Sequence, residues 1–443
     1  MTIPQIAALQ LQKQYRQYGP EFPRRLQQNY GDLFRVWMPL LPPIYFALHP
    51  DHVYAVLSQP RPPLEKPTFM RRALQSSFGN GLFTSQGDFW RRQRRLMQPA
   101  FHHGRITRYA AQMTGHAQKM VNSWQDGQII SIGEAMHELT FAIVMDALFS
   151  ADEAAANTAV VHQAVRDLGQ GLAAFSRSLP LSFLPAWTPL PALRQKRRGE
   201  RALAQCVQGM IAERRALGEA ASPPDLLTTL LFARDEETGD AMSDQQLQDE
   251  LITLYIAGHD TTAVLLGWAW VLLAQHEPAA ATLTAELEQT LNGRPPTTAD
   301  LPQLPYAQMI VKETLRLYPP AWYLFRQAEV GLTLDGEPIP DGAIIFLMPY
   351  TTQRDGRWFA GPNNFQPERW QDGFEKSLPK GAYFPFGLGP RTCIGNGFAL
   401  MEAQLLLATI AQQFRLEQLT EAKMGDTPTL GFAAPVKVRL HKR

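Results

Sequence analysis

The sequence predicts a mainly α fold with small β-sheets. From Trp90 to about residue 290, apolar residues recur at three- and four-residue spacing, and Ala, Leu, Gln, Glu and Arg are frequent. The first eighty residues instead carry short β-like runs at 33–37 and 44–48. Beyond Pro319, short strand and turn patterns return, followed by one last helical pattern. We therefore expect helices over about 90–318 and 397–414, and a small β-rich region over about 30–60 and 320–380.

The composition excludes several broad classes of protein. The chain has 443 residues and a formal net charge of +1, which gives no nucleic-acid-binding signature. No zinc-finger spacing or nucleotide-binding glycine loop is present, so no nucleic-acid partner is expected. The two cysteines, Cys206 and Cys393, fit a reducing compartment without disulfide bonds. Cys206 is interpreted as an ordinary helical side chain.

The sequence gives no sign of a membrane anchor. Residues 1–13 lack both the apolar core of a signal peptide and a stretch of about 20 apolar residues that could span a bilayer. The longest uncharged, largely apolar run, 261–275, is too short to span and is interpreted as a buried core helix. We expect a soluble, cytoplasmic monomer.

Proline-rich interruptions break the helical region at 179–185 and 189–191. Apolar side chains surround these prolines. The segment fits either a mobile lid over a hydrophobic pocket or a surface loop that packs on the core.

Cys393 lies in a glycine-spaced loop, Phe386-Gly-Leu-Gly-Pro-Arg-Thr-Cys-Ile-Gly395. The three glycines allow sharp turns that bring backbone N–H groups toward the sulfur, where hydrogen bonds favour thiolate over thiol. Arg391 adds positive charge nearby. A buried free cysteine in a tight turn is the alternative interpretation, but the spacing F-x-x-G-x-R-x-C-x-G resembles the haem-ligand loop of the cytochrome P450 family.

This resemblance implies that Cys393 is the axial thiolate ligand of the iron in haem b, with Phe386 and Gly395 among the cofactor-binding residues. It also implies a triangular, single-domain fold over residues 1–443, with the haem between a long central helix and the cysteine loop. Trp90, Asp260, Glu313 and Cys393 lie far apart in the sequence. If they serve one cofactor, most of the chain forms one interdependent unit.

A second motif, Ala257-Gly-His-Asp-Thr-Thr262, falls in the middle of a helical pattern. Glycine in a helix interior costs about 1 kcal/mol, and threonine can bond back to a carbonyl one turn earlier. A tolerated kink is the structural alternative. In the resembled family this stretch passes over the distal face of the haem. The resemblance implies that Ala257 and Gly258 make room for dioxygen, while Asp260 and Thr261 relay protons to it.

A third motif pairs Glu313 with Arg316 on one helical face, and a later segment supplies Arg369. An isolated i,i+3 pair is usually a solvated pair worth a few tenths of a kcal/mol. The surrounding residues are apolar, however, and the resemblance implies a buried three-residue network beside the haem loop. Relatives often have His-Arg-Asp where this chain has Gln353-Arg-Asp355, which leaves one local hydrogen bond in question.

The fourth motif, Trp90-Arg-Arg-Gln-Arg94, places an indole and a guanidinium on one helical face. The resemblance assigns both residues to the haem propionates, together with Arg326 and Arg391. The remaining arginines of this helix, Arg91, Arg92 and Arg95, fall on other faces. They fit either a merely solvated basic surface or a docking surface for an acidic electron donor.

The resemblance implies a monooxygenase that inserts one oxygen atom of O2 into a C–H bond or double bond of a lipophilic substrate. Fifty residues follow Cys393, too few for a flavin or iron–sulfur domain. We therefore expect a separate electron donor, a ferredoxin or a flavodoxin with its reductase. Direct use of hydrogen peroxide is the less favoured alternative, because Asp260 and Thr261 are both retained.

Two functions from other classes remain open at this stage. The chain could be a haem-thiolate isomerase or dehydratase, or a binding protein for hydrophobic ligands without turnover. Oxygen uptake that needs reductant and rises with substrate would separate the monooxygenase from both.

The segments that would form the substrate pocket are mostly apolar and aromatic, which favours a fatty acid, terpenoid or steroid over a charged molecule. Trp90, where many soluble bacterial relatives have histidine, suggests the branch that contains fatty-acid hydroxylases. The predicted pocket segments are 67–83, 175–187, Ala257, 321–324 and 430–432.

Overall fold

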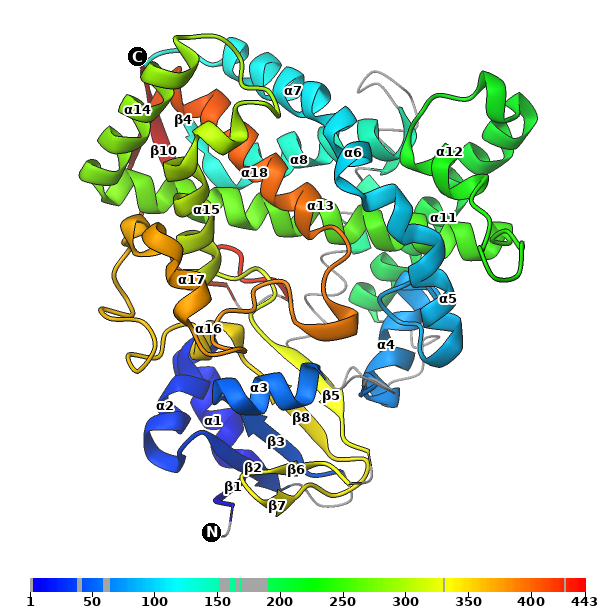
Figure 1. Ribbon diagram of the computed structural model, residues 1–443, viewed down its shortest axis with the longest axis vertical. Coiled ribbons are helices and arrows are strands. Elements are labelled where there is room, and N and C mark those ends of the chain that lie inside the picture. The colour runs from blue at the N-terminus through cyan, green and yellow to red at the C-terminus, as the bar shows by residue number, and fades with distance from the viewer. Residues whose placement is uncertain are drawn as a thin grey trace.

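The computed structural model describes residues 3–37, 42–58, 64–150, 160–161, 163–164, 167–168, 190–329, 331–425 and 428–443 (Figure 1). The predicted lid segment 179–185 and the pocket segment 175–187 lie outside these residues.

Helices make up most of the described chain, as the sequence predicted, but the first four of them lie within residues 8–78, before the predicted helical region and where only β-like runs were predicted. They are α1 (Ala8–Tyr18), α2 (Phe22–Tyr30), α3 (Pro50–Leu57), α4 (Thr68–Phe78), α5 (Gly87–Met97), α6 (His103–Ile106), α7 (Ala110–Ser123), α8 (Ile132–Phe149), α11 (Pro191–Leu217), α12 (Leu226–Leu231), α13 (Asp244–Gln275), α14 (Glu277–Leu291), α15 (Pro305–Leu317), α16 (Pro349–Thr352), α17 (Phe374–Ser377) and α18 (Asn396–Ala411). Short 3-10 turns relevant to the site are η6 (Pro367–Gly373) and η7 (Gly389–Arg391).

The strands form three small sheets. Their bounds are β1 (Gln5–Ala7), β2 (Leu33–Trp37), β3 (Ile44–Ala47), β4 (Ile129–Ser131), β5 (Leu324–Gln327), β6 (Thr333–Leu334), β7 (Glu337–Pro338), β8 (Ile344–Leu347), β9 (Phe414–Gln418) and β10 (Lys437–Lys442). The largest sheet has the order β1-β2-β3-β8-β5, so its two halves come from opposite ends of the sequence. Figure 1 shows this sheet at one end of the molecule, beside α1 to α3.

Stacked aromatic side chains stabilise the pairing between the amino-terminal strands of this sheet and β8. In the strand register, Phe34 pairs with Phe46, and Phe46 pairs with Phe346. Their rings stack with centroids 5.0 Å and 5.4 Å apart. Cross-strand aromatic pairs of this kind stabilise a sheet beyond simple burial. They fix β8, and with it the neighbouring strand β5, against the amino-terminal strands.

Helix α13 runs through the middle of the helical part (Figure 1). It begins at a capping box between Ser243 and Gln246, and its 32 residues give a length of about 48 Å. In the described part of the chain it is the one helix long and apolar enough to cross a bilayer, yet 72% of its most apolar window is buried inside the protein. Helices α8, α11, α15 and α18 pack against it.

The last helix is shorter than the sequence predicted. It ends at Ala411, not at residue 414, and Phe414 begins strand β9. Phe414 and Leu416 are both buried while Arg415 between them is exposed, the two-residue alternation of a strand. The apolar residues at 414 and 416 continue the hydrophobic pattern, so the sequence alone did not reveal this boundary.

Candidate active site

The loop before α18 is held by glycines at its turns and by backbone hydrogen bonds. Gly387 and Gly389 have φ angles of 72° and 69°, in the left-handed region that glycine adopts without strain. Gly389 also packs against α3, since a Cβ there would lie 2.1 Å from the carbonyl oxygen of Leu57. The N–H of Cys393 donates to the carbonyl of Phe386 at 2.9 Å. These contacts fix Cys393 just ahead of the N-terminus of α18.

Cys393 lies deep in the protein, yet its side chain is accessible. Burial raises the pKa of its thiol, whereas the N–H of Gly395 and the guanidinium of Arg94 lower it. The cation that lowers the pKa of this thiol is Arg94, and Arg391 pairs with Glu65. A metal ion deprotonates a coordinating thiol outright. The loop therefore presents Cys393 as a ligand for a metal centre.

Helix α13 continues through the Ala257–Thr262 stretch, and part of its surface is accessible there. The Thr261 hydroxyl donates to the Ala257 carbonyl at 2.6 Å, the back-bond that the sequence suggested. Ala257 is exposed although most of α13 is buried. A Cβ on Gly258 would meet Val144 of α8 at 3.4 Å, so the glycine lets α8 approach closely. The structure places the adjacent side chains of Asp260 and Thr261 at this accessible stretch of the helix.

Helix α5 and the cysteine loop are joined by cationic side chains. The Arg391 guanidinium lies over the buried ring of Trp90, with its central carbon 4.2 Å from the ring centroid. Arg94 donates to the carbonyl of Thr392 at 2.8 Å, and Arg391 donates to the carbonyl of Ser85 at 3.2 Å. The structure thus brings Trp90, Arg94, Arg391 and the neighbour of Cys393 together.

Arg326, on β5, joins the same cluster of positive charge. Burial and the neighbouring Arg391 lower the pKa of Arg326 to about 10. Lys66, which lies between the β-rich end and α4, also belongs to this cluster: burial, Arg326 and Arg391 all lower its pKa. Glu65 is the carboxylate that pairs with Arg391. Sequence reasoning missed both Lys66 and Glu65, because nothing in their local pattern shows that they pack against β5 and the cysteine loop.

The residues present fit a haem with two propionates. Lys66, Arg326 and Arg391 share Glu65 as their carboxylate in the described part of the chain, so the cluster keeps an excess of buried positive charge. Buried cations need anionic partners. Two propionate carboxylates would neutralise this excess, and the Cys393 sulfur would ligate the iron. The donor set therefore matches the cofactor that the sequence predicted.

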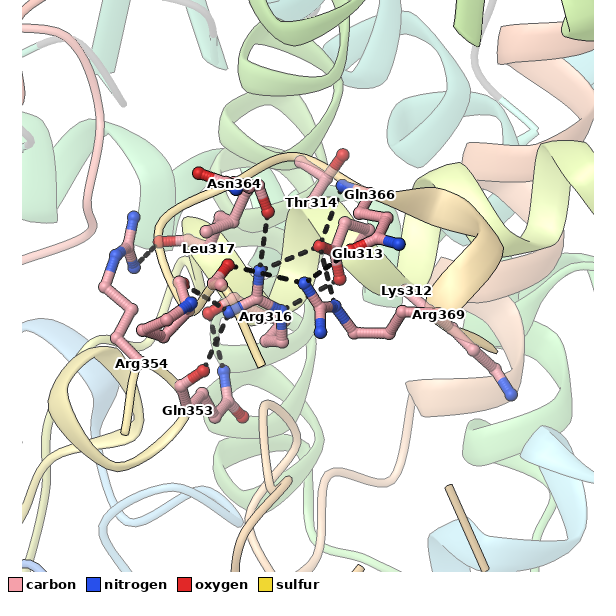
Figure 2. A network of polar contacts seen from close by, with 12 residues as sticks. Lys312, Glu313, Thr314, Arg316, Leu317, Gln353, Arg354, Asn364, Gln366 and Arg369 are labelled. Atoms are coloured by element: carbon pink, nitrogen blue, oxygen red, sulfur yellow. Dashed lines mark hydrogen bonds and ion pairs between the residues drawn. The ribbon is translucent and has the colours of Figure 1, made fainter. Parts of the chain in front are cut away.

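Glu313 is the shared acceptor of a buried network (Figure 2). Arg316 donates to both of its carboxylate oxygens at 2.8 Å, and Arg369 donates to one of them at 3.2 Å. The indole N–H of Trp370 and the backbone N–H of Gln366 add bonds of 2.9 Å and 3.0 Å. Glu313 and Arg316 are both fully buried. Helix α15 and turn η6 are thereby tied together at one carboxylate.

Gln353 resolves the local hydrogen bond that the sequence left in question. Its amide nitrogen donates to the carbonyls of Leu315 and Arg316, at 3.0 Å and 3.1 Å. Its amide oxygen accepts from the N–H of Phe384 at 2.9 Å. Glutamine therefore bridges the end of α15 and the segment that leads to the cysteine loop.

The three remaining arginines of α5 have local partners. Arg91 pairs with Asp88, Arg92 lies 3.9 Å from Asp240, and Arg95 lies 3.0 Å from both Asp235 and Glu237. These carboxylates reduce the positive field that the arginines would present to an acidic partner.

Glu402, on α18, is a buried acid that the sequence did not single out. It has no exposed surface. Burial raises the pKa of its carboxyl to about 8, while the Thr262 side chain on α13 lowers it by a smaller amount. Glu402 is therefore a neutral acid near pH 7 at the contact between α18 and α13.

We expect the substitution Glu402→Gln to flatten the pH dependence of stability. The folded pKa lies above the unfolded value, so the folded protein binds more protons between about pH 4.5 and 8. Its contribution is complete below that range and is lost as the pH rises, by about 1.4 kcal/mol per pH unit. Urea unfolding at pH 6 and pH 8 should show a smaller loss for Glu402→Gln than for the unchanged protein. Equal losses would contradict this assignment.

Comparison with known proteins agrees with the geometry. The family model described as Cytochrome P450 matches residues 4–442. Cyclooctatin synthase of Streptomyces melanosporofaciens is 36% identical over 392 residues, which cover 88% of this chain and 84% of that protein. Cyclooctat-9-en-7-ol 5-monooxygenase of the same organism is 36% identical over 84% of this chain and 80% of its own length. Pentalenene oxygenase of Streptomyces avermitilis is 33% identical over 89% of this chain and 87% of its own length.

The family match spans residues 4–442, the range in which every motif described above lies. It confirms the predicted mainly helical fold and the predicted cofactor class. The chain belongs to the cytochrome P450 family, as a haem b monooxygenase that inserts one oxygen atom of O2 into a lipophilic substrate with electrons from a redox partner.

Proposed function

We propose that the chain oxidises a cyclic terpenoid, by C–H hydroxylation or epoxidation. The proposal rests on the similarity of the chain to enzymes whose names specify cyclooctat-9-en-7-ol and pentalenene. The side chains expected at the pocket support an apolar ligand: Phe83 is 39% exposed, and Ala257 and Leu324 also have accessible surface. The fatty-acid branch suggested by Trp90 stays a prediction and defines the competing substrate class.

We assign the roles of the site residues as follows. Haem supplies oxygen activation when it is bound, and the thiolate of Cys393 would hold its iron and donate electron density. Trp90, Arg94, Arg326 and Arg391 would bind the propionates, with Lys66 beside them. Ala257, which is exposed, would leave space for dioxygen, whereas the missing side chain of Gly258 faces Val144 of α8. Phe386 and Gly395 belong to the cysteine loop, which would hold the haem from its other side. Glu313, Arg316 and Arg369 hold the loop's supporting structure in place.

Asp260 and Thr261 would supply protons on the face opposite Cys393. The hydroxyl proton of Thr261 is donated to Ala257, so its oxygen lone pairs remain able to accept. Asp260 is the next side chain along the helix and is 37% exposed, which lets it exchange protons with water. Protons from solvent can therefore reach the accessible stretch of α13 through Asp260 and Thr261.

We also propose that the chain acts as one domain and as a cytoplasmic monomer. The proposed haem-site residues come from α5, α13, β5 and the loop before α18, which fits one interdependent unit. The relatives named above are bacterial, which supports a cytoplasmic location. We propose a ferredoxin or a flavodoxin, with its reductase, as electron donor. Its contact with α5 must compete with the carboxylates that already pair with Arg91, Arg92 and Arg95.

Substrate-induced spectra test the proposed substrate class. Holoprotein is titrated with pentalenene, with cyclooctat-9-en-7-ol and with palmitic acid, and each is then incubated with O2 and a ferredoxin or flavodoxin system. We expect the terpenoids to shift the haem spectrum and to be oxidised in a reductant-dependent reaction. A shift and product with palmitic acid alone would replace the terpenoid proposal by the fatty-acid one.

We expect Thr261→Ala to uncouple the consumption of reductant from the formation of product. Removing the hydroxyl takes away a proton donor and acceptor, and positioned acid–base groups contribute about 10²–10⁴ in rate. Product formed per reductant consumed should fall at least about tenfold, with hydrogen peroxide released instead. Thr261→Ser keeps the hydroxyl and serves as the matched control. Unchanged coupling in Thr261→Ala would contradict the assigned role.

A further inference from the structure

His137, on α8, lies against the proton-handling stretch of α13. Its ring Nδ1 is 3.9 Å from a carboxylate oxygen of Asp260. Its backbone carbonyl is 3.1 Å from the ring Nε2 of His259, and the two imidazole rings have centroids 5.2 Å apart. No motif in the sequence marked this histidine, because the contact depends on how α8 crosses α13.

The contact between α8 and α13 is well defined on both sides of His137. One turn later on α8, the Thr140 hydroxyl lies 3.0 Å from the His259 carbonyl. Phe141 packs edge-on against the His259 ring at 5.9 Å. Val144 lies beside Gly258, one further turn along. Helix α8 therefore follows α13 past the residues that flank Asp260, and the position of His137 relative to Asp260 is fixed by packing.

His137 and Asp260 are placed where this helix contact reaches water. Their side chains are 39% and 37% exposed, whereas Thr140 and Phe141 are buried. An imidazole has two ring nitrogens, so it can take up a proton at one of them and release a proton from the other. The pair thus places an imidazole beside the acid that precedes Thr261.

We propose that His137 is a positioning residue for oxygen activation: it orients Asp260 and passes protons to it from water. The inference rests on the role proposed for Asp260 and Thr261. One proton moves from the imidazolium Nδ1 to a carboxylate oxygen of Asp260, which becomes a neutral acid and passes that proton on toward Thr261. The neutral imidazole then takes a proton from a solvent water, and the hydroxide left behind is neutralised by the buffer. No electron and no co-reactant are consumed. The two atoms are 3.9 Å apart, longer than a direct hydrogen bond, so a water between them would carry the proton.

Other charged groups around His137 are few in the described residues. His259 and Asp260 face it from α13. Glu134 and Glu138 are its nearest acidic neighbours along α8, and both are exposed. Asp260 is the acid that connects His137 with Thr261, so a substitution at His137 should affect proton supply through Asp260.

The variant His137→Gln tests the proposal, because glutamine keeps hydrogen-bonding atoms but cannot carry the proton. Its matched control is His116→Gln. His116 pairs with Asp146 at 3.0 Å between α7 and α8, away from the Asp260 contact. Both holoproteins are assayed with pentalenene, O2 and a ferredoxin system between pH 6 and pH 8, and product per reductant is measured.

We expect His137→Gln to lose about threefold in product per reductant at pH 8 and to recover at pH 6. Recovery follows because Asp260 is itself accessible, so a higher proton concentration replaces the missing relay. His116→Gln should follow the unchanged protein at every pH. A pH profile of His137→Gln that parallels the profile of the unchanged protein would overturn the proposal. This holds even if the variant is less stable to heat, because loss of a packing contact lowers stability without changing the pH profile.

A second measurement decides the question without any substrate. Dithionite-reduced holoprotein, freed of excess reductant, is mixed first with oxygenated buffer and then with reduced ferredoxin, which supplies the second electron, in H2O and in D2O at pH 8, and the decay of the Soret band is followed. We expect the ratio of the decay rates in H2O and D2O to be about twofold larger in His137→Gln than in the unchanged protein. Equal ratios would overturn the proposal.

Failure of this inference can be told apart from failure of the proposed function. If Thr261→Ala leaves coupling unchanged, the proton role of the Asp260–Thr261 pair is wrong, and the role of His137 is wrong with it. If Thr261→Ala wastes electrons while His137→Gln behaves as the unchanged protein in both measurements, the His137 relay alone is wrong.

Discussion

Cys393→Ser is expected to abolish monooxygenase activity while leaving the fold intact. Serine is nearly isosteric, and the hydrogen bond from the Cys393 backbone N–H to the Phe386 carbonyl does not depend on the side chain. A hydroxyl does not become the electron-donating anion that a thiolate ligand provides. Turnover of the proposed substrate should fall by at least about 100-fold, equivalent to about 2.7 kcal/mol of activation free energy.

The second cysteine offers the control for this experiment. Cys206 lies on α11, is partly exposed, and belongs to the surroundings of the hydrophobic core. Cys206→Ser should keep the activity and the haem spectrum of the unchanged protein. Activity that survives in Cys393→Ser, or that is lost equally in both variants, would contradict the assignment of Cys393 as the ligand.

Glu313→Ala is expected to prevent assembly of stable holoprotein. The substitution leaves the buried guanidiniums of Arg316 and Arg369, and the N–H groups of Trp370 and Gln366, without their shared acceptor. Breaking a buried ion pair by removing one partner costs about 3–5 kcal/mol. That is a large part of the stability of a typical protein. Expression should give aggregate or haem-free protein.

An exposed ion pair on the same helix provides the comparison. Lys312 lies 2.7 Å from Glu375, and both side chains reach solvent. Such surface pairs contribute about 0–1 kcal/mol. Glu375→Ala should therefore give soluble protein with full haem content. Soluble Glu313→Ala with the same haem content and thermal midpoint would show that the network is not needed for the fold.

The parts of the site that the sequence predicted are those in which short-range spacing determines geometry. Glu313 and Arg316 are three residues apart on one helix, so they share a face wherever the helix packs. The cysteine loop is similar, since Gly387 and Gly389 can adopt positive φ angles that most residues avoid. The back-bond from Thr261 to Ala257 is also a local property of the helix.

The parts that the sequence did not predict depend on contacts between distant segments. Lys66 lies near Arg326 only because the segment before α4 is brought against β5 by the fold. Glu402 and His137 face α13 from two different helices, and neither lies in a recognisable motif. The interaction of Arg94 with the Cys393 sulfur is another example, because the sequence assigned Arg94 to the haem propionates alone. Residue spacing along the chain contains no information on such contacts.

The boundaries of elements follow the same distinction. The helix that begins at Asn396 was predicted within one residue at its start, where the cysteine loop forces a turn. Its end was predicted three residues too late, because buried apolar side chains continue into strand β9. Only pairing with β10 distinguishes the strand from a further helical turn.

The spectrum of the dithionite-reduced protein under carbon monoxide tests the central claim most directly. With haem bound through a Cys393 thiolate, we expect a strongly red-shifted Soret band in the unchanged protein and its loss in Cys393→Ser. A haem-replete protein without that band would show that Cys393 is not the iron ligand, and the proposed oxygen-activating roles of Asp260, Thr261 and His137 would then be wrong as well.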